Sequence, residues 1–478
     1  MAYREQVLAP DYRFAAENLK HDFIDAMTAH LDAVLRLPDM AAADVQADGA
    51  RLRAELVALH DEPAPVQGES VPDLYFALQS RLTERCGAAT SLVRVGLSRN
   101  DLDMTAYKMH GRRLVLRLSE AVLRLRRQLL EAAQAHLDTV LIAYTHHQPG
   151  QPTTVAHYLG AVEDQLARDS QRLRETYARL NTCPLGAAAL AGSSHPLDRR
   201  YTAAALGFDG PVLNTYDAVA SADWEFDIAA TSQSVALGLG RFVTDLIAWA
   251  TRGAFRLGDD LVQGSSIMPQ KRNPVSLEHA RTRLSRACGS AAMVVYSAHN
   301  IPFADLNDFG PDIQGGILAQ HKQLMGALDL LSACLAGGSF DTAVLDAEAR
   351  ATDTTATELA DVLVRSGGID FPTAHRVVAA LLALLTRDGR LLSDATPADV
   401  EAAGGPRLDE GELAAAIDPA SFVARRAGLG MPGRSAMAGS LERARDRLTA
   451  DEADLAGRMG AVQRALEELR RPCAAGAS

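Results

Sequence analysis

The spacing of the proline residues is the feature of this sequence that most limits how the chain can fold. Residues 73–148, 212–268 and 312–371 contain no proline. Because proline inside a helix removes a backbone hydrogen bond and clashes with the preceding turn, these three gaps permit very long helices. A chain of 478 residues can therefore be organised around uninterrupted helices.

The residues inside the gaps also favour helices. In Arg112–Leu141, leucines recur near helical spacing, with arginine and glutamate between them. The same pattern occurs in Thr153–Leu180, Ala218–Leu261, Val275–His299 and Asp312–Leu335. Alternating strand patterns are scarce, and aromatic residues make up only 5% of the chain. Helices longer than about 25 residues are typical of bundles, so the sequence predicts a mainly α protein with a long central bundle.

The length predicts about three domains, at roughly 150 residues each. We expect residues 1–106 to form a smaller N-terminal helical domain and residues 107–357 to form the long-helix bundle. Residues 358–478 read as a small C-terminal helical domain, because glycine and proline separate shorter helices at Gly404–Pro406 and Gly428–Gly433.

Charge and cysteine usage limit the class of protein. There are 48 Lys and Arg against 60 Asp and Glu, a net charge of −12, which argues against nucleic acid as a partner. Met1–Val7 lack the character of a secretory signal, and no apolar run is long enough to cross a membrane. The cysteines are odd in number and scattered, as is typical of reduced thiols, so we expect a cytoplasmic protein without a membrane partner. They are Cys86, Cys183, Cys288, Cys334 and Cys473.

The segment Gly264–Pro274, GSSIMPQKRNP, is the most informative for function. Its glycine and serines make a flexible loop whose backbone N–H groups can face an anion. Lys271 and Asn273 add a charge and an amide donor, two residues apart on one side of an extended stretch. Pro274 suits the first turn of the following helix. Capture of an anion followed by proton transfer is the chemistry that this string indicates.

Two further motifs, SRND at Ser98–Asp101 and THHQ at Thr145–Gln148, accompany this loop in the chain. Together the three segments resemble those of the aspartase/fumarase superfamily, whose members eliminate fumarate from succinyl compounds. Within it, the sequence is most similar to argininosuccinate lyase, and Gln270 stands where adenylosuccinate lyases usually carry histidine. The segments that also carry this likeness are Gly186–Arg199, Ala351–Gly367 and Asp418–Gly430.

Such an elimination removes a weakly acidic Cβ proton next to a carboxylate, so it needs carboxylate clamps, a base and an acid for the leaving nitrogen. The resemblance implies that Ser265 is the base, that His146 serves the acid side, and that Glu278 pairs with this histidine and raises its pKa. Lys271 would stabilise charge on the succinyl carboxylate and the serine alkoxide. The residues expected to bind substrate are Ser98, Arg99, Asn100, Thr145, Gln148, Ser266, Met268 and Asn273.

Simpler interpretations exist for several of these residues. Arg99 and Asp101 could form a surface ion pair, and His146 with His147 could be a polar entry to a helix. A metal site is not indicated, because the chain lacks HExxH and compact His/Cys clusters. We therefore expect neither a metal nor an organic cofactor.

The sequence also departs from the pattern usual in argininosuccinate lyases. Leu97 replaces an arginine, and Leu102 replaces a glutamine. Tyr75 stands where the family usually has a histidine, and Ala222 where it often has an arginine. His147 occupies a position that is usually leucine. These changes surround the part of the site that should meet the amine, whereas the succinyl clamp is retained.

The sequence therefore predicts a three-domain fumarase/aspartase-like lyase that releases fumarate from an N-substituted succinate by anti elimination, with argininosuccinate as the leading candidate. The alternative substrate is another N-succinyl amine, such as an aminopolycarboxylate of the ethylenediamine-disuccinate type or a specialised-metabolism intermediate. The alternative from another class is a non-catalytic structural homologue of the crystallin type. The resemblance further implies a homotetramer in which three subunits share each site, and long apolar helix stripes suit such an assembly.

Overall fold

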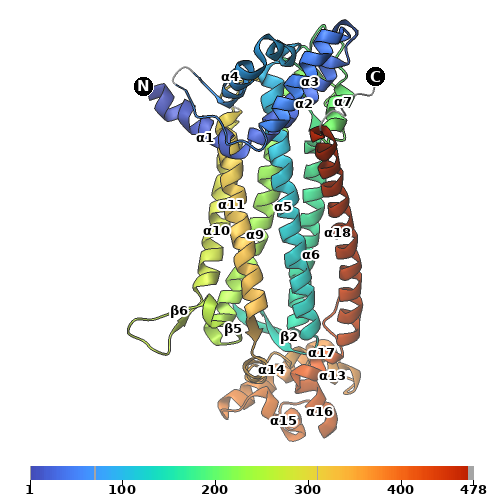
Figure 1. Ribbon diagram of the computed structural model, residues 1–478. Coiled ribbons are helices and arrows are strands. Elements are labelled where there is room, and N and C mark those ends of the chain that lie inside the picture. The colour runs from blue at the N-terminus through green and yellow to red at the C-terminus, as the bar shows by residue number, and fades with distance from the viewer. Residues whose placement is uncertain (1, 69–70, 309, 472–478) are drawn as a thin grey trace.

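The computed structural model describes residues 2–68, 71–308 and 310–471, and its long helices run side by side (Figure 1). The mainly α fold with a long bundle is confirmed. Within the described ranges, no helix combines the length and apolar character needed to cross a membrane. The six helices that span the bundle are α5 (Arg99–Ala135), α6 (Val155–Leu180), α9 (Asp223–Arg252), α10 (Val275–Ser297), α11 (Pro311–Gly337) and α18 (Arg434–Arg470).

Shorter helices gather at the two ends of the bundle (Figure 1). One end carries α1 (Ala9–Asn18), α2 (Lys20–Leu35), α3 (Ala43–Ala58), α4 (Leu74–Cys86), α7 (Arg199–Ala205) and α8 (Thr215–Ala220). The other end carries α12 (Thr342–Arg350), α13 (Ala356–Arg365), α14 (Phe371–Arg387), α15 (Pro397–Ala402), α16 (Glu410–Ile417) and α17 (Pro419–Ala424). This second group of helices encloses a small hydrophobic core of its own, which includes Leu363, Leu381 and Leu413. The large core of the bundle is separate from it.

Strands are few and short. β1 (Val140–Thr145) and β2 (Gln148–Thr154) form an antiparallel hairpin. The remaining pairs are β3 (Thr182–Cys183) with β4 (Gly210–Pro211), β5 (Phe255–Leu257) with β8 (Gly338–Phe340), and β6 (Gln263–Gly264) with β7 (Arg272–Asn273). The short 3₁₀ and π helices are η1 (Arg4–Leu8), η2 (Pro38–Met40), η3 (Gly87–Arg94), η4 (Asp259–Leu261) and η5 (Leu392–Asp394). These small elements mainly turn the chain between long helices.

Two of the predicted helical stretches have different limits in the structure. Arg112–Leu141 runs past the end of α5 at Ala135 and into β1, which begins at Val140. Helix α5 itself begins earlier, at Arg99, because Ser98 and Asp101 form a capping box at its N-terminus. Ala218–Leu261 is divided into α8, α9 and β5. Gly253 ends α9, since its φ of +77° is a left-handed conformation that glycine adopts without strain.

The bundle also draws on residues outside the range 107–357. Helix α5 crosses the predicted boundary between residues 106 and 107, and α18 lies along α5 and α6 although it falls within the predicted C-terminal range. The described part of 358–478 therefore contributes both to the small end group and to the bundle. The glycines and proline of Gly428–Gly433 are followed by the long helix α18, not by another short helix as predicted.

A buried ionic cluster joins α18 to the bundle. The side chains of Arg126 and Glu163 are 0% and 1% exposed, and Nε of Arg126 donates to Oε1 of Glu163 at 2.8 Å. Arg126 also donates to Asp451 of α18 at 2.6 Å and to Ser170 at 3.1 Å. Arg447 of α18 also pairs with Glu163, at 3.3 Å. Because a buried charge without its partner is costly, these two arginines tie α18 to α5 and α6.

We predict that Arg126→Ala lowers the free energy of unfolding by about 3–5 kcal/mol, because it removes the buried partner of Glu163 and leaves this carboxylate with the longer pairing to Arg447. Arg127→Ala is the matched control: this neighbour pairs with Glu452 but is 54% exposed, and removal of such a surface pair costs less than about 1 kcal/mol. Denaturant unfolding at fixed protein concentration measures both. Equal losses for the two variants would contradict the role given to the cluster.

Candidate active site

The SRND motif forms the N-terminal cap of α5. Ser98 Oγ accepts a hydrogen bond from the backbone N–H of Asn100 at 3.3 Å, and the Ser98 N–H donates to Asp101 at 3.0 Å. The Asn100 side-chain amide donates to the carbonyl of Ala189 at 3.3 Å. The motif therefore fixes its own turn while it holds the loop that follows β3.

Asp101 is an anchor and does not pair with Arg99. Its carboxylate is fully buried and accepts the backbone N–H groups of Gly186 and Ala188 at 2.8 and 2.9 Å. Burial raises its pKa to about 7, although these N–H donors favour the charged form. The alternative of an Arg99–Asp101 surface ion pair is thus wrong.

Arg99 pairs instead with two other aspartates. Its Nη2 lies 2.6 Å from Asp103, one helical turn along α5, and its Nη1 contacts Asp73, the N-cap of α4. Burial raises the pKa of Asp103 to about 6, against the opposing effect of Arg99. Sequence reasoning did not identify Asp73 or Asp103. The i,i+4 spacing of Arg99 and Asp103 was the available signal for one of them.

The THHQ motif forms the turn of the β1–β2 hairpin. Thr145 and Gln148 are paired across the turn, and His146 and His147 occupy its tip with φ of 53° and 61°. Two-residue turns of this kind favour asparagine and glycine, and other side chains are strained there. All four side chains are exposed. The alternative of a polar helix entry is wrong, because α6 begins only at Val155.

The GSSIMPQKRNP segment is the connection from β6 to α10. Oγ of Ser265 accepts the backbone N–H groups of Ile267 and Met268 at 3.4 and 3.1 Å. Ser265 is half-buried, whereas Ser266 and Met268 are exposed. The oxygen of Ser265 therefore accepts two backbone N–H groups of its own loop.

The cationic and amide groups of the loop lie on its return. Lys271 is exposed, and Asn273 is half-buried where it pairs with Gln263 of β6. Arg272 between them binds Asp259 and the carbonyl of Leu257, so it is directed back to the protein. Glu278 is exposed in the first turn of α10. Lys271 is left available to a ligand or to another chain.

The three motifs do not meet within one chain. The 37 residues of α5 separate SRND from the hairpin by about 55 Å along the bundle. The loop 264–274 lies at the same end as the hairpin but projects away from the bundle on the side opposite α18 (Figure 1). One described chain therefore presents two incomplete groups of site residues, one at each end.

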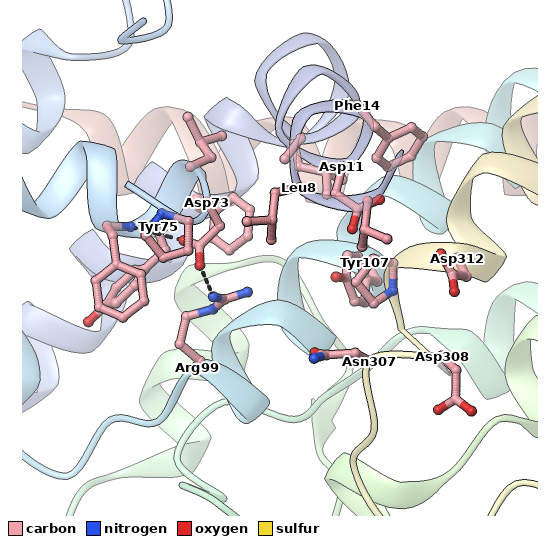
Figure 2. A pocket seen from close by; sticks show the side chains of 18 of the residues that line it. Leu8, Asp11, Phe14, Asp73, Tyr75, Arg99, Tyr107, Asn307, Asp308 and Asp312 are labelled. Atoms are coloured by element: carbon pink, nitrogen blue, oxygen red, sulfur yellow. Dashed lines mark hydrogen bonds and ion pairs between the residues drawn. The ribbon is translucent and has the colours of Figure 1, made fainter. Parts of the chain in front are cut away.

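A cavity of about 460 Å³ opens beside Arg99 (Figure 2). Among the five residues named above as departures from the argininosuccinate lyase pattern, only Tyr75 lines it. Leu102 is fully buried in the core, and Leu97 and Ala222 are partly buried against that core. The two leucines thus pack the protein rather than face this cavity.

Comparison with known proteins identifies the family. A family model described as Lyase matches residues 34–289, and one described as Argininosuccinate lyase C-terminal matches residues 353–424. The argininosuccinate lyase of Methanoculleus marisnigri is 36% identical, over 89% of this chain and 87% of its own. The chain belongs to the argininosuccinate lyase family. Membership of this family confirms the prediction of a carbon–nitrogen lyase that releases fumarate.

Other relatives extend the comparison. Argininosuccinate lyase 2 of Agrobacterium fabrum is 32% identical, over 95% of this chain and 91% of its own. The crystal structure of EDDS lyase in complex with formate has a TM-score of 0.86 and 30% identity, and covers 96% of this chain and 93% of its own. This chain is thus similar both to proteins named argininosuccinate lyase and to a structure named EDDS lyase.

Asp101→Asn is expected to loosen the loop after β3, because the amide cannot accept all the N–H groups that the carboxylate accepts. A loss of about 1–3 kcal/mol corresponds to roughly ten- to hundredfold faster exchange of the Gly186 and Ala188 amides. Hydrogen–deuterium exchange measures it. Asp48→Asn, at an exposed pair with Arg51, serves as the control, and unchanged exchange at residues 186–188 in Asp101→Asn would disprove the anchoring role.

Proposed function

We propose that this protein eliminates fumarate from an N-substituted succinate, with argininosuccinate as the leading candidate. The observation that carries the proposal is the geometry of Ser265, whose oxygen accepts two backbone N–H groups in a loop that also bears Lys271 and Asn273. Such donors stabilise an alkoxide, and an alkoxide is the form in which serine removes a proton.

The reaction needs a base for the Cβ proton and an acid for the nitrogen that leaves. Ser265 takes the Cβ proton while Lys271 and Asn273 hold the adjacent carboxylate, on which negative charge gathers. His146, presented at the hairpin tip and supported by Glu278, serves the departing nitrogen. Ser98, Arg99 and Asn100 hold the substrate at the other end, and Thr145, Gln148, Ser266 and Met268 complete its contacts.

We further propose a homotetramer in which three subunits supply each site. The support is the separation of SRND from the hairpin by the length of α5, together with the exposure of the hairpin and of the loop. Exposed apolar side chains along the bundle also suit a subunit contact. They include Leu237, Met293, Val295 and Tyr296.

Two compounds or compound classes are candidates for the substrate of this reaction. Similarity to argininosuccinate lyases over nearly the whole chain favours argininosuccinate. Structural similarity to EDDS lyase supports the alternative of another N-succinyl amine. A purely structural role of the crystallin type would not require the donor arrangement around Ser265. Release of fumarate from a panel of N-succinyl compounds, followed by its ultraviolet absorbance, tests the function directly; no fumarate from any of them would reject it.

We propose a cytoplasmic location for this metabolic role. The cysteines of the described ranges, Cys86, Cys183, Cys288 and Cys334, are all free thiols, as is usual in a reducing compartment. Cys473 lies outside the described residues.

Ser265→Ala should reduce kcat by more than about tenfold, or about 1.4 kcal/mol, while substrate still binds through the clamps. Ser285→Ala, an exposed serine on α10 whose hydroxyl bonds only to Arg281, is the matched control and should keep wild-type kcat. Steady-state fumarate release measures both. If Ser265→Ala retained more than a tenth of kcat, the base would have to be sought at Ser266 or His146.

Mixing two inactive variants tests the shared site. Ser265→Ala and His146→Asn tetramers, dissociated together and reassembled, should regain part of the activity, because some mixed sites contain neither substitution. Each variant reassembled alone is the control and should stay inactive. Absence of recovery in tetramers shown to contain both chains would mean that each site is built within one chain.

A further inference from the structure

The turn that presents His146 is not held by its own side chains. Residues 145–148 are all exposed, and their side chains form no hydrogen bond or ion pair with a described residue. His146 and His147 adopt left-handed φ of 53° and 61°, a conformation that is strained for side chains of this kind. Because a strained turn persists only where the surrounding structure fixes it, the position of His146 must be set from the strands on either side.

Tyr144, the residue of β1 directly before this turn, is bound to two other elements. Its hydroxyl donates to Oε1 of Glu348 on α12 at 2.6 Å. Arg252, in the last turn of α9, lies over the Tyr144 ring, with 4.9 Å between its Cζ and the ring centroid. Nε of Arg252 is also 3.5 Å from the same Glu348 oxygen. Three side chains from β1, α9 and α12 thus form one cluster beneath the turn, the Tyr144 cluster.

A β-bulge lies exactly where Tyr144 leaves the regular hairpin. Ala143 pairs with Gln151, whereas Tyr144 pairs with Pro149, so Gly150 is an extra residue in β2. A Cβ at Gly150 would lie 3.0 Å from the carbonyl oxygen of Ala143, which leaves little room for a larger residue. Bulges change the direction of neighbouring side chains, and we attribute the direction of Tyr144, toward α12, to this one.

The two partners of Tyr144 are held in place by a small sheet. Strand β5 follows α9, β8 precedes α12, and the two strands pair with each other. The backbone N–H of Asp341, the N-cap of α12, donates to the carbonyl of Ala254 at 2.9 Å, and Arg256 pairs with the Asp341 carboxylate at 2.8 Å. Glu348 and Arg252 are therefore carried by elements that are joined to each other independently of the hairpin.

The bond from Tyr144 to Glu348 is a charge-assisted hydrogen bond. Burial raises the pKa of Tyr144, and the hydrogen bond to Glu348 raises it further, so the hydroxyl keeps its proton and donates. The Glu348 side chain is only 17% exposed, which strengthens a bond to its carboxylate. On β2, which lies beside α17 (Figure 1), the corresponding contact joins the neutral groups of Gln151 and Thr357 at 3.2 Å. The Tyr144 cluster is thus the stronger of these two attachments of the hairpin.

We infer that Tyr144, Glu348 and Arg252 are positioning residues for the elimination, and that they hold the turn so that His146 meets the departing nitrogen. The inference rests on the proposed function and adds to it a group of residues outside the three motifs. These side chains act through the turn and do not themselves touch the substrate. Since a displacement of about 1 Å at a catalytic group can cost about a hundredfold in rate, a bond two residues from His146 is enough to control turnover.

Tyr144→Phe tests the inference, because it removes only the hydroxyl. Steady-state fumarate release is measured with the N-succinyl compound that the wild-type protein cleaves fastest. We expect kcat to fall at least about tenfold, while KM changes less than about threefold, because SRND and the Ser265 loop bind the substrate from other segments. Tyr158→Phe is the matched control: it removes a hydroxyl that bonds to Asp245 within the bundle, and it should keep wild-type kcat.

Two variants of Glu348 separate positioning from a general structural effect. Glu348→Ala should lower kcat as much as Tyr144→Phe does, whereas Glu348→Gln should keep most of kcat, because its amide oxygen still accepts the tyrosine hydroxyl. Tyr144 is 40% exposed, so the denaturant concentration at half-unfolding should stay at the wild-type value in all these variants.

Three results would overturn the inference while the proposed function stands. They are a fall in kcat of less than tenfold in Tyr144→Phe, an equal loss in Glu348→Gln and Glu348→Ala, and a loss of kcat that is accompanied by an equal loss in the Tyr158→Phe control or by easier unfolding. If the wild-type protein released no fumarate from any N-succinyl compound, the proposed function would be rejected, and this inference with it.

Discussion

The length of helix α5 is the constraint on which the rest of the structure depends. Its 37 residues carry SRND at one end and lead into the hairpin at the other, so a distance of about 55 Å is fixed between two groups that the proposed reaction uses together. A bundle this long also exposes apolar helix faces that a second copy can cover. The separation of the motifs follows from this helix, and the proposed assembly of copies is the arrangement that would bring them together.

Much of the fold could be predicted from the sequence because proline is absent where long helices occur. The start of α5 could also be predicted, since Ser98 with Asp101 three residues later forms a capping box. The break between α8 and α9 was not, because Ser221 and Ala222 between them include neither glycine nor proline. Nor was the end of α9 at Gly253, because Gly238 and Gly240 lie inside the same helix. The return of α18 along the bundle depends on contacts such as Arg126 with Asp451, 325 residues apart, which no local pattern reveals.

The candidate site could likewise be predicted only in part from the sequence. The motifs located the loop, the hairpin and the SRND turn, because their residue types carry the chemistry in short segments. Part of what surrounds Arg99 was not predicted, since Asp73 and Tyr107 come from separate segments that only the fold brings together. Leu97 and Leu102 seemed to border the amine, yet Leu102 lies in the core and Leu97 packs against it. Position beside a motif in sequence does not establish position beside a ligand.

The central claim is that one fumarate-forming site is assembled from three subunits. The most direct test is an experimental structure of the assembled protein with bound fumarate. The account predicts fumarate between the Ser265 loop of one subunit and the His146 turn of a second, with Arg99 of a third beside it. Fumarate held by residues of a single chain, or at a place remote from the Ser265 loop, would contradict it.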